Sequence, residues 1–387
     1  MRKIEHKTKS IQLRYLDFTV KVGVPGDNDL LWLKEYLSPP FGIVKSSRFD
    51  CEIDLIFNDQ EFSSLFGKSS QSKMKLSGFI LDTRIVELKL WPSSGNCKIL
   101  FDEEYNVFYF VSKNIRKITI LAHSVKSIGF RTALGRIITE LAMNYSRASG
   151  GHFIHSAALS YRGEGIMIAG PKNAGKTSLL IYLLQKLSAK FISNDRVLVS
   201  HNGATPFIYG MPTVITVSEK SLQMFPRLKN KFSKFNFHHR HTADEIVKRN
   251  CIPYKLETGE FTLSTEQFCR LLRVNPSSCS QLSMILFPRI NERKRTIVFK
   301  KLSRTAALER LKESQFARNI SESLSFFYLQ DKDLSSLNNE KNYEKFSSKL
   351  AAETACYDCY LGHQIYQSTG MSEAIRSSLF QAQKTSS

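Results

Sequence analysis

One eight-residue segment constrains this chain more than any other: Gly170-Pro171-Lys172-Asn173-Ala174-Gly175-Lys176-Thr177. It fits the pattern G-x-x-x-x-G-K-[ST], with a strand-like run at residues 165–169 before it and a helix-like run at residues 178–184 after it. Glycines allow the backbone to wrap around an anion, and the following helix directs its N-terminal amides at that anion. We therefore expect Gly170 to Ser178 to bind ATP, with Lys176 at the outer phosphates and the Thr177 hydroxyl on Mg²⁺. An ordinary glycine-rich turn is the alternative interpretation.

Length and composition indicate a folded protein. The chain has 387 residues, enough for two or three domains, and 42% of them are hydrophobic, which can supply real cores. The excess of 55 Lys and Arg over 35 Asp and Glu gives a net charge of +20, which suits anionic partners. The sequence shows no signature of a nucleic-acid-binding module, so we do not expect nucleic acid as the main partner.

The cysteines and the N-terminus favour the cytoplasm. Seven scattered cysteines, an odd number, argue against a secreted disulfide framework. Cys356 and Cys359 have C-x-x-C spacing, but no second pair completes a zinc site, so we interpret them as buried thiols in a strand. The first residues are charged, with no apolar core after them, and no apolar run is long enough to span a membrane. We expect a cytoplasmic protein without a membrane partner.

The pattern of strands and helices divides the chain into three parts. Residues 1–125 carry alternating apolar runs and one short helix at residues 27–36, which predicts an antiparallel α+β module. Residues 126–330 form the expected nucleotide-binding core, entered by a helix at about residues 127–146. Residues 331–387 form a C-terminal extension of helix and strand with a frayed end.

Within the core, the order strand, turn, strand, glycine motif, helix, strand is predicted from residue 151 onward. A strand at residues 155–159 precedes the motif, and a short strand at residues 191–193 follows its helix. Further strands are expected at residues 214–217 and 282–287, with a helix at residues 305–313. The fold class is therefore α/β.

Two residues outside the motif are candidates for chemistry. Asp195 follows a strand-like run about twenty residues after Lys176, where a carboxylate can reach magnesium or accept a hydroxyl proton. An aspartate that opens a turn is the alternative. His155 starts an apolar run before the motif, and a packed or surface histidine is its alternative. The run from His238 to His241 is interpreted as a basic surface patch, because neighbouring side chains point in different directions and do not converge on a metal.

An ordered series of segments resembles the catalytic domain of HPr kinase/phosphorylase and the HPr-kinase-related proteins. The series comprises residues 154–158, 163–170, the glycine motif and residues 191–197. The resemblance implies a P-loop kinase core of the HPr kinase C-terminal domain type. It also implies that His155 lies at the active site, that the motif holds ATP, and that Asp195 serves magnesium and the attacking hydroxyl.

The likeness covers clearly about fifty residues, and this chain departs from the family in three ways. Asn194 stands where the family has the first aspartate of a pair, and Lys172-Asn173-Ala174 replaces the usual Ser-Gly pair. The Glu-x-Arg-Gly segment of true HPr kinases is not found. Members of the family assemble as oligomers, so a homo-oligomer is an arrangement that the resemblance leaves open.

The sequence thus predicts an ATP-dependent phosphotransferase. The expected acceptor is a hydroxyl, serine above all, in a protein or acidic peptide, with Asp195, His155 and Lys176 as catalytic residues and Thr177 and Asp195 as magnesium ligands. The alternatives are a catalytically weak nucleotide-binding regulator, which the missing second acid favours, and a small-molecule kinase. A nucleic-acid-dependent NTPase rests on the charge alone.

Overall fold

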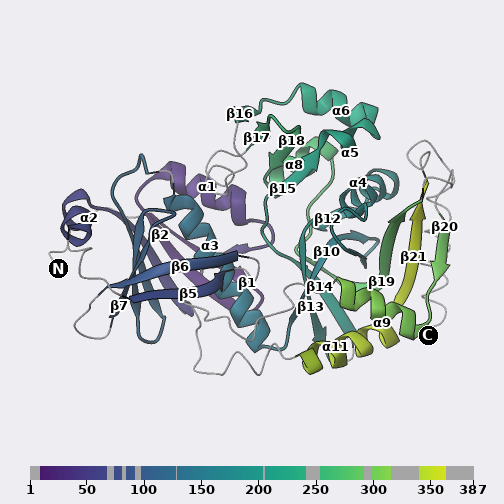
Figure 1. The fold of residues 1–387 in the computed structure, drawn as a ribbon, viewed down its shortest axis with the longest axis horizontal. Helices are drawn as coiled ribbons and strands as arrows, with labels where there is room; N and C mark the ends of the chain where they lie inside the picture. The colour runs from purple at the N-terminus through teal and green to yellow at the C-terminus, as the bar shows by residue number, and fades with distance from the viewer. Residues whose placement is uncertain are drawn as a thin grey trace. The chain divides into compact units, whose positions relative to one another are not determined.

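The computed structural model describes residues 9–67, 74–80, 84–91, 97–127, 129–203, 205–240, 253–291, 298–314 and 340–362. These residues form a mixed α/β fold with large mixed sheets (Figure 1). Two compact units can be distinguished among them: one contains the described residues up to Ser149 and the other those from Gly150 onward.

The first unit is built on a nine-stranded sheet in the order β3-β1-β2-β4-β9-β8-β7-β6-β5. Its strands are β1 (Lys9–Tyr15), β2 (Phe18–Val24), β3 (Gly42–Val44), β4 (Cys51–Phe57), β5 (Met74–Ile80), β6 (Arg84–Trp91), β7 (Cys97–Asp102), β8 (Val107–Ser112) and β9 (Lys117–Ala122). In β4 the buried Cys51, Ile53 and Leu55 alternate with more exposed residues, which is the pattern of a strand with one face on a core.

The expectation of an antiparallel module is wrong for the middle of this sheet. β4 pairs in parallel with both β2 and β9, whereas the remaining pairs are antiparallel. Alternating apolar residues predict a half-exposed strand in either case, because the side-chain period of two is the same in parallel and antiparallel pairs. The strand positions were therefore predictable, and their directions were not.

In the described part of this unit, three helices accompany the sheet: α1 (Asp27–Leu37), α2 (Asp59–Phe66) and α3 (Phe130–Ala148). The predictions of α1 and α3 are confirmed to within a few residues. α3 packs against β2, β9 and α1 and therefore belongs to the first unit. The prediction that this helix belongs to the nucleotide-binding core is wrong.

The second unit contains an eight-stranded sheet. Its strands are β10 (His152–Tyr161), β11 (Glu164–Ala169), β12 (Lys190–Ser193), β13 (Arg196–Asn202), β14 (Thr205–Gly210), β19 (Cys279–Ile290), β20 (Val298–Lys301) and β21 (Ala355–Leu361). β11 pairs in parallel with β19, and β19 pairs in parallel with β21. The pairings of β10, β11, β19, β14 and β13 form a closed circuit. The strands predicted at residues 155–159, 165–169, 191–193 and 282–287 are thereby confirmed, and the C-terminal part of the chain contributes β21 to the same sheet.

Helices cover both faces of this sheet (Figure 1). In β11, Ile166 and Ile168 join the core shared with α4 (Lys176–Leu187), whereas Met167 and Ala169 join the core on the other face. That other face is covered by α9 (Arg304–Glu313) and α11 (Glu340–Glu353), through Leu311 and other apolar residues. Because β11 is buried on both faces, it appears in the sequence as a continuous apolar run.

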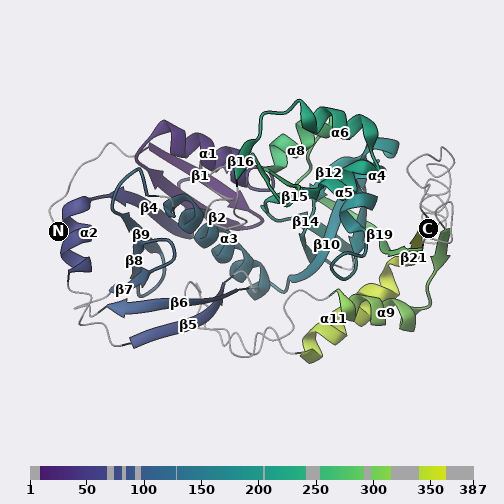
Figure 2. The same ribbon diagram turned by 45° about the horizontal axis from the view of Figure 1, so that its top comes forward.

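A smaller sheet and three helices lie on the α4 side of the second unit (Figure 2). The sheet has the order β15-β18-β17-β16. Its strands are β15 (Ile215–Ser218), β16 (His238–Arg240), β17 (Tyr254–Leu256) and β18 (Glu260–Leu263), and the helices are α5 (Glu219–Gln223), α6 (Pro226–Ser233) and α8 (Thr265–Leu272). Apolar side chains of β15, β18, α5, α6 and α8 share the core of α4.

Two further expectations can be compared with the described residues. Cys356 and Cys359 are buried thiols in β21, as predicted, and burial raises the pKa of the Cys356 thiol to about 12. Among the helices that the structure describes, none has the length and apolar character needed to cross a membrane. The expected frayed end, from Gln381 onward, lies outside the described residues.

Candidate functional site

The glycine motif forms a tight connection between β11 and α4, which we call the glycine loop (Gly170–Thr177). β11 ends at Ala169 and α4 begins at Lys176, so the order of strand, loop and helix expected from the sequence is present. Positive φ angles occur at Gly170 (153°), Asn173 (67°) and Gly175 (98°), and such angles favour glycine and tolerate asparagine.

The N-terminal end of α4 is open to an anion. Gly175 occupies the position before the helix and supplies no side-chain cap, and the first turn contains no acidic residue. The amide groups of this turn therefore have no side-chain acceptor from the cap position, and the positive end of the helix dipole is not offset by a local carboxylate.

The side chain of Lys176 is held by backbone carbonyl groups of the glycine loop. Its Nζ donates hydrogen bonds to the carbonyl oxygens of Gly170 and Pro171, both at 2.8 Å, and the residue is 8% exposed. Burial lowers the pKa of its ammonium group to about 8, although the negative charge of Asp195 opposes this shift. A buried cation with only carbonyl partners is predisposed to bind a stronger anionic acceptor.

The glycine loop lies where three parallel strands end. β11, β19 and β21 run in the same direction, so their carboxyl ends meet at one edge of the sheet. A Cβ atom added to Gly175 would lie 2.9 Å from Leu361 Cδ1, and one added to Gly170 would lie 3.9 Å from Pro288 Cδ. In open and in barrel-like α/β sheets, ligands bind at the carboxyl ends of the parallel strands, so the loop has the location of a ligand site.

Asp195 and His155 form a pair beside this edge. His155 Nε2 lies 3.4 Å from Asp195 Oδ1, and both side chains are partly exposed. Burial raises the pKa of the Asp195 carboxyl, but the hydrogen bond from His155 and the charges of Arg196 and Lys176 outweigh that effect and lower the pKa overall. The carboxylate is thus ionised at neutral pH and lies in the electrostatic field of the lysine.

Hydrogen bonds to backbone carbonyl groups fix the turn that carries Asp195. The amide of Ser156 in β10 donates to the Asp195 carbonyl at 3.2 Å, and the Ser193 hydroxyl donates to the Arg196 carbonyl at 2.6 Å. His155 is opposite Arg196 in the pairing of β10 with β13. The pair of side chains is therefore presented by a strand and by a turn that is bonded to it.

Asn194 occupies a buried position next to Asp195. The residue is 9% exposed, and its Oδ1 atom makes no hydrogen bond with the part of the chain that the structure describes. A buried acceptor without a partner carries a free-energy cost of about 1–3 kcal/mol, which a bound donor or cation would remove.

The structure adds charged residues that the sequence analysis did not consider. Arg289 and Arg310 both approach Asp358 Oδ1, with their Nε atoms at 3.6 Å and 3.2 Å. The two arginines, with Glu313, also line a pocket of about 380 Å³ that includes Gly170, Pro171 and Ala174 of the glycine loop. These residues lie far apart in the chain, so no local motif could reveal them.

The other predicted site residues have different environments. Pro171, Lys172 and Asn173 are exposed, Thr177 is partly buried and Ser178 is buried. Within the described residues, the Thr177 hydroxyl makes no hydrogen bond with another side chain, and no cluster of three or more His, Cys, Asp or Glu side chains suits a metal ion. The structure thus associates Lys176, Asp195 and His155 electrostatically and shows no direct link from Thr177 to Asp195.

Comparison with protein-family models and with curated protein sequences gives no match to this chain.

Proposed function

We propose that this protein is an ATP-dependent kinase of the HPr-kinase-related type, which works in the cytoplasm and transfers the γ-phosphoryl group of ATP to a serine hydroxyl of a protein or peptide. The observation that carries the proposal is the buried Lys176 ammonium, which lies within the glycine loop at the open end of α4 and is coupled to Asp195. Strand, glycine loop, helix and lysine together are the arrangement that phosphate binding requires.

On nucleotide binding, the Lys176 ammonium exchanges its two carbonyl acceptors for phosphate oxygens. The exchange is favourable because the ammonium is already desolvated, so its attraction to an anion is only weakly screened. The amides of the first turn of α4 bind the phosphates from the same side.

The donor set near the glycine loop fits Mg²⁺, which prefers oxygen ligands. Thr177 supplies a hydroxyl and Asp195 a carboxylate, and the Asn194 side-chain oxygen is an acceptor without a partner among the described residues. Bound Mg²⁺ neutralises negative charge on the phosphates. A site with a single carboxylate binds Mg²⁺ more weakly than a site with two, so we expect the activity to require a high concentration of Mg²⁺.

The Asp195 and His155 pair orients the acceptor. In the transfer step a bond forms between the serine oxygen and the γ-phosphorus while the bond from the γ-phosphorus to the bridging oxygen breaks, and the hydroxyl proton passes to the pair. The products are a phosphoserine and ADP. Asp195 is ionised and hydrogen-bonded to His155, so it can accept that proton.

The pocket beside the glycine loop suits the acceptor segment. Its apolar lining includes Phe287, Ile290 and Tyr360. Its arginines, Arg289 and Arg310, are matched by Asp358 and Glu313, so their formal charges cancel. A volume of about 380 Å³ can hold one or two side chains of a peptide. Because the charges of the pocket cancel, the bound segment need not be anionic.

The experiment that tests this function is transfer of label from [γ-³²P]ATP to a cell extract. The parent protein with Mg²⁺ is expected to label polypeptide at serine, and the Lys176→Ala and Asp195→Asn variants are expected to lose labelling. Equal labelling by parent and Lys176→Ala would show that the glycine loop does not serve the transfer. Label found only in small metabolites would identify a small-molecule kinase instead.

One observation favours the nucleotide-binding regulator as a second candidate. Asn194 cannot accept a proton as a base, and it leaves Asp195 as the one carboxylate of the turn. A regulator binds ATP to saturation without forming ADP, so ATP affinity and ADP release measured on the same sample separate the two functions. Restoration of ADP formation by Asn194→Asp would identify the missing acid as the cause.

A further inference from the structure

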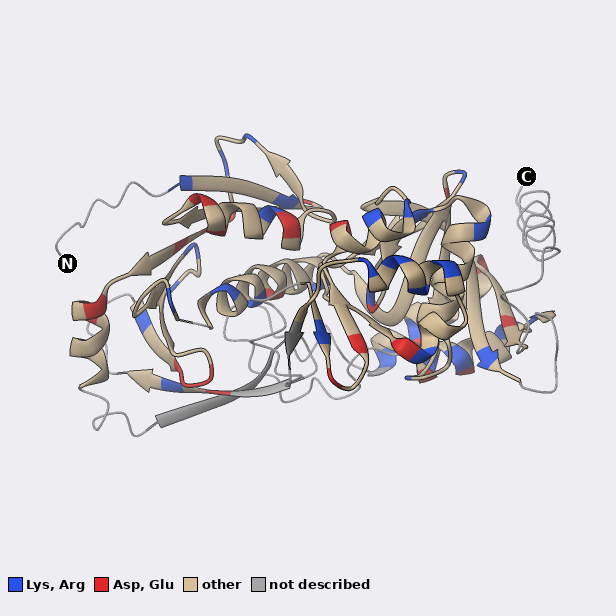
Figure 3. Cartoon of the chain, turned by 90° about the horizontal axis from the view of Figure 1, so that it is seen from above, with Lys and Arg blue, Asp and Glu red and all other residues tan. Residues whose placement is uncertain are grey.

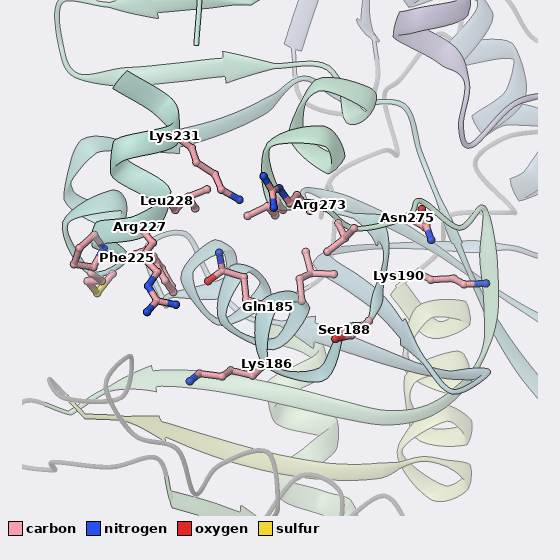
Figure 4. A pocket seen from close by; sticks show the side chains of 16 residues that line it. Gln185, Lys186, Ser188, Lys190, Phe225, Arg227, Leu228, Lys231, Arg273 and Asn275 are labelled. Carbon is pink, nitrogen blue, oxygen red and sulfur yellow. The ribbon is translucent and has the colours of Figure 1, made fainter. Parts of the chain in front are cut away.

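A second pocket, which we call the basic pocket, lies at the other end of α4 from the glycine loop. It has a volume of about 860 Å³. Residues of α4, α6, α8 and the segments beside them line it (Figure 4): Leu184, Gln185, Lys186, Ser188, Ala189, Lys190, Met224, Phe225, Pro226, Arg227, Leu228, Lys231, Leu272, Arg273, Val274 and Asn275. Because α4 has 12 residues, its two ends are about 18 Å apart. The basic pocket is therefore distinct from the site proposed above.

The charged lining of the basic pocket has one sign. Five cationic residues contribute, namely Lys186, Lys190, Arg227, Lys231 and Arg273, and none of the described aspartates and glutamates lines it. None of the five forms an ion pair with a carboxylate of a described residue. Lysine and arginine recur along the helices of this unit (Figure 3). Unneutralised cations that surround one hollow favour an anionic ligand.

The backbone around the basic pocket changes this balance only slightly. The C-terminal ends of α4 and α8 contribute carbonyl groups, each end equivalent to about half a negative charge, and Lys231 Nζ donates to the Leu271 carbonyl at 3.1 Å. The first turn of α6 also lines the pocket, with no side-chain cap and no acidic residue, and it adds a positive end. Five full charges exceed these partial charges.

The apolar part of the lining defines the ligand further. Seven of its residues are Leu, Ala, Met, Phe or Val; Met224 and Val274 among them are partly exposed, and Pro226 beside them is exposed. An inorganic anion alone would leave this apolar surface unused. Single-stranded nucleic acid requires exposed aromatic faces for base stacking, whereas Phe225, the one aromatic residue among the described residues of the lining, is 7% exposed.

We infer that the basic pocket binds an acidic peptide segment of a partner protein, with an apolar side chain of the segment inserted between α4 and α6. Carboxylates of the segment pair with the cationic rim, and its apolar residue covers the exposed parts of Met224, Pro226 and Val274, as in the anchor-and-rim organisation of protein interfaces. This binding needs no nucleotide, so it stands independently of the proposed kinase activity.

The test is binding of the fluorescently labelled peptide Asp-Glu-Leu-Asp-Glu to the full chain, followed by fluorescence anisotropy without nucleotide. We expect Arg227→Glu to weaken binding at least about tenfold, because it removes an attractive charge and adds a repulsive one. Lys229→Glu is the matched control: it makes the same charge change on the same helix at an exposed residue outside the lining, and it should weaken binding less than about threefold.

Each remaining outcome also decides the inference. The peptide Asp-Glu-Gly-Asp-Glu should bind more weakly than the leucine peptide. In competition experiments on the parent protein, neither inorganic phosphate nor oligothymidylate should displace the leucine peptide preferentially. Equal loss in Arg227→Glu and Lys229→Glu, equal binding of the two peptides, or preferential displacement by phosphate or oligonucleotide would overturn it. Lys176→Ala should bind the peptide like the parent, so failure of the kinase proposal would leave this result unchanged.

Discussion

At the scale of single residues, Lys176 has an unusual environment for a lysine. A lysine side chain rarely lies in the interior, and here its ammonium has two carbonyl acceptors within the glycine loop and a depressed pKa of about 8. A residue kept charged at a free-energy cost is expected to serve binding rather than stability. The sequence motif predicts this residue directly, since the spacing of glycines and lysine is local.

The cost of burying Lys176 predicts a pH-dependent stability. Between pH 8 and about 10.5 the unfolded chain retains a proton that the folded chain releases, so this group makes the parent more stable as the pH rises. Lys176→Met has no such group. We expect the variant to be more stable than the parent at pH 7 by about 2–3 kcal/mol, with the difference shrinking toward pH 10. Urea unfolding of both proteins across this range measures it, and a constant difference would contradict the shifted pKa.

At the scale of elements, the glycine loop depends on conformations that few residues adopt. Gly175 has a φ of 98°, and its Cα faces Leu361 at the end of β21. An alanine there is strained by its backbone, and its Cβ requires the leucine to move. The loop is therefore shaped by contact with a strand from the far end of the chain.

Gly175→Ala is expected to weaken ATP binding by about tenfold, because a change in the loop backbone misplaces the amides that face the phosphates. Gly163→Ala is the matched control. Gly163 has a similar φ of 90°, and no atom lies within 4 Å of the position that its Cβ would occupy. Both variants should lose about 1–2 kcal/mol of stability from the strained backbone. Titration with an ATP analogue should show weaker binding in Gly175→Ala only, and equal affinities would exclude a role for the loop geometry.

Sequence patterns predicted several elements of the second unit, because each of these elements carries its own periodicity. β10, β11, α4, β12 and α9 were expected within a few residues of their observed bounds. Strand direction and the contributions of Arg289, Arg310 and Asp358 were not predicted. The pattern of one strand does not specify its neighbour, and these three residues meet only because β19, β21 and α9 pack together.

At the scale of the whole molecule, the first unit has a polar group in its core that is unrelated to the proposed site. Arg136 in α3 is 2% exposed and donates to Asp102 Oδ2 at 2.6 Å, and its guanidinium lies 4.4 Å from the ring centroid of Tyr105. Tyr109 donates a hydrogen bond to the same carboxylate oxygen. The charge pair fixes α3 on the sheet of this unit.

Asp102→Asn is expected to destabilise the first unit by about 3–5 kcal/mol, because it leaves the buried Arg136 cation without its counter-charge. Asp59→Asn removes the carboxylate of an exposed pair with His123 and should cost less than about 1 kcal/mol. Thermal unfolding followed by circular dichroism compares the two. At temperatures below its unfolding transition, the Asp102→Asn variant should bind ATP with the affinity of the parent, since the proposed site residues all belong to the second unit.

The most direct measurement of the central claim is calorimetric titration of the full chain with a non-hydrolysable ATP analogue and Mg²⁺. The account predicts that the parent binds one nucleotide and that Lys176→Ala binds it at least about thirtyfold more weakly, because a charge-assisted contact in a desolvated site is lost. A parent protein that does not bind the analogue, or a variant that binds it as tightly as the parent, would contradict the account.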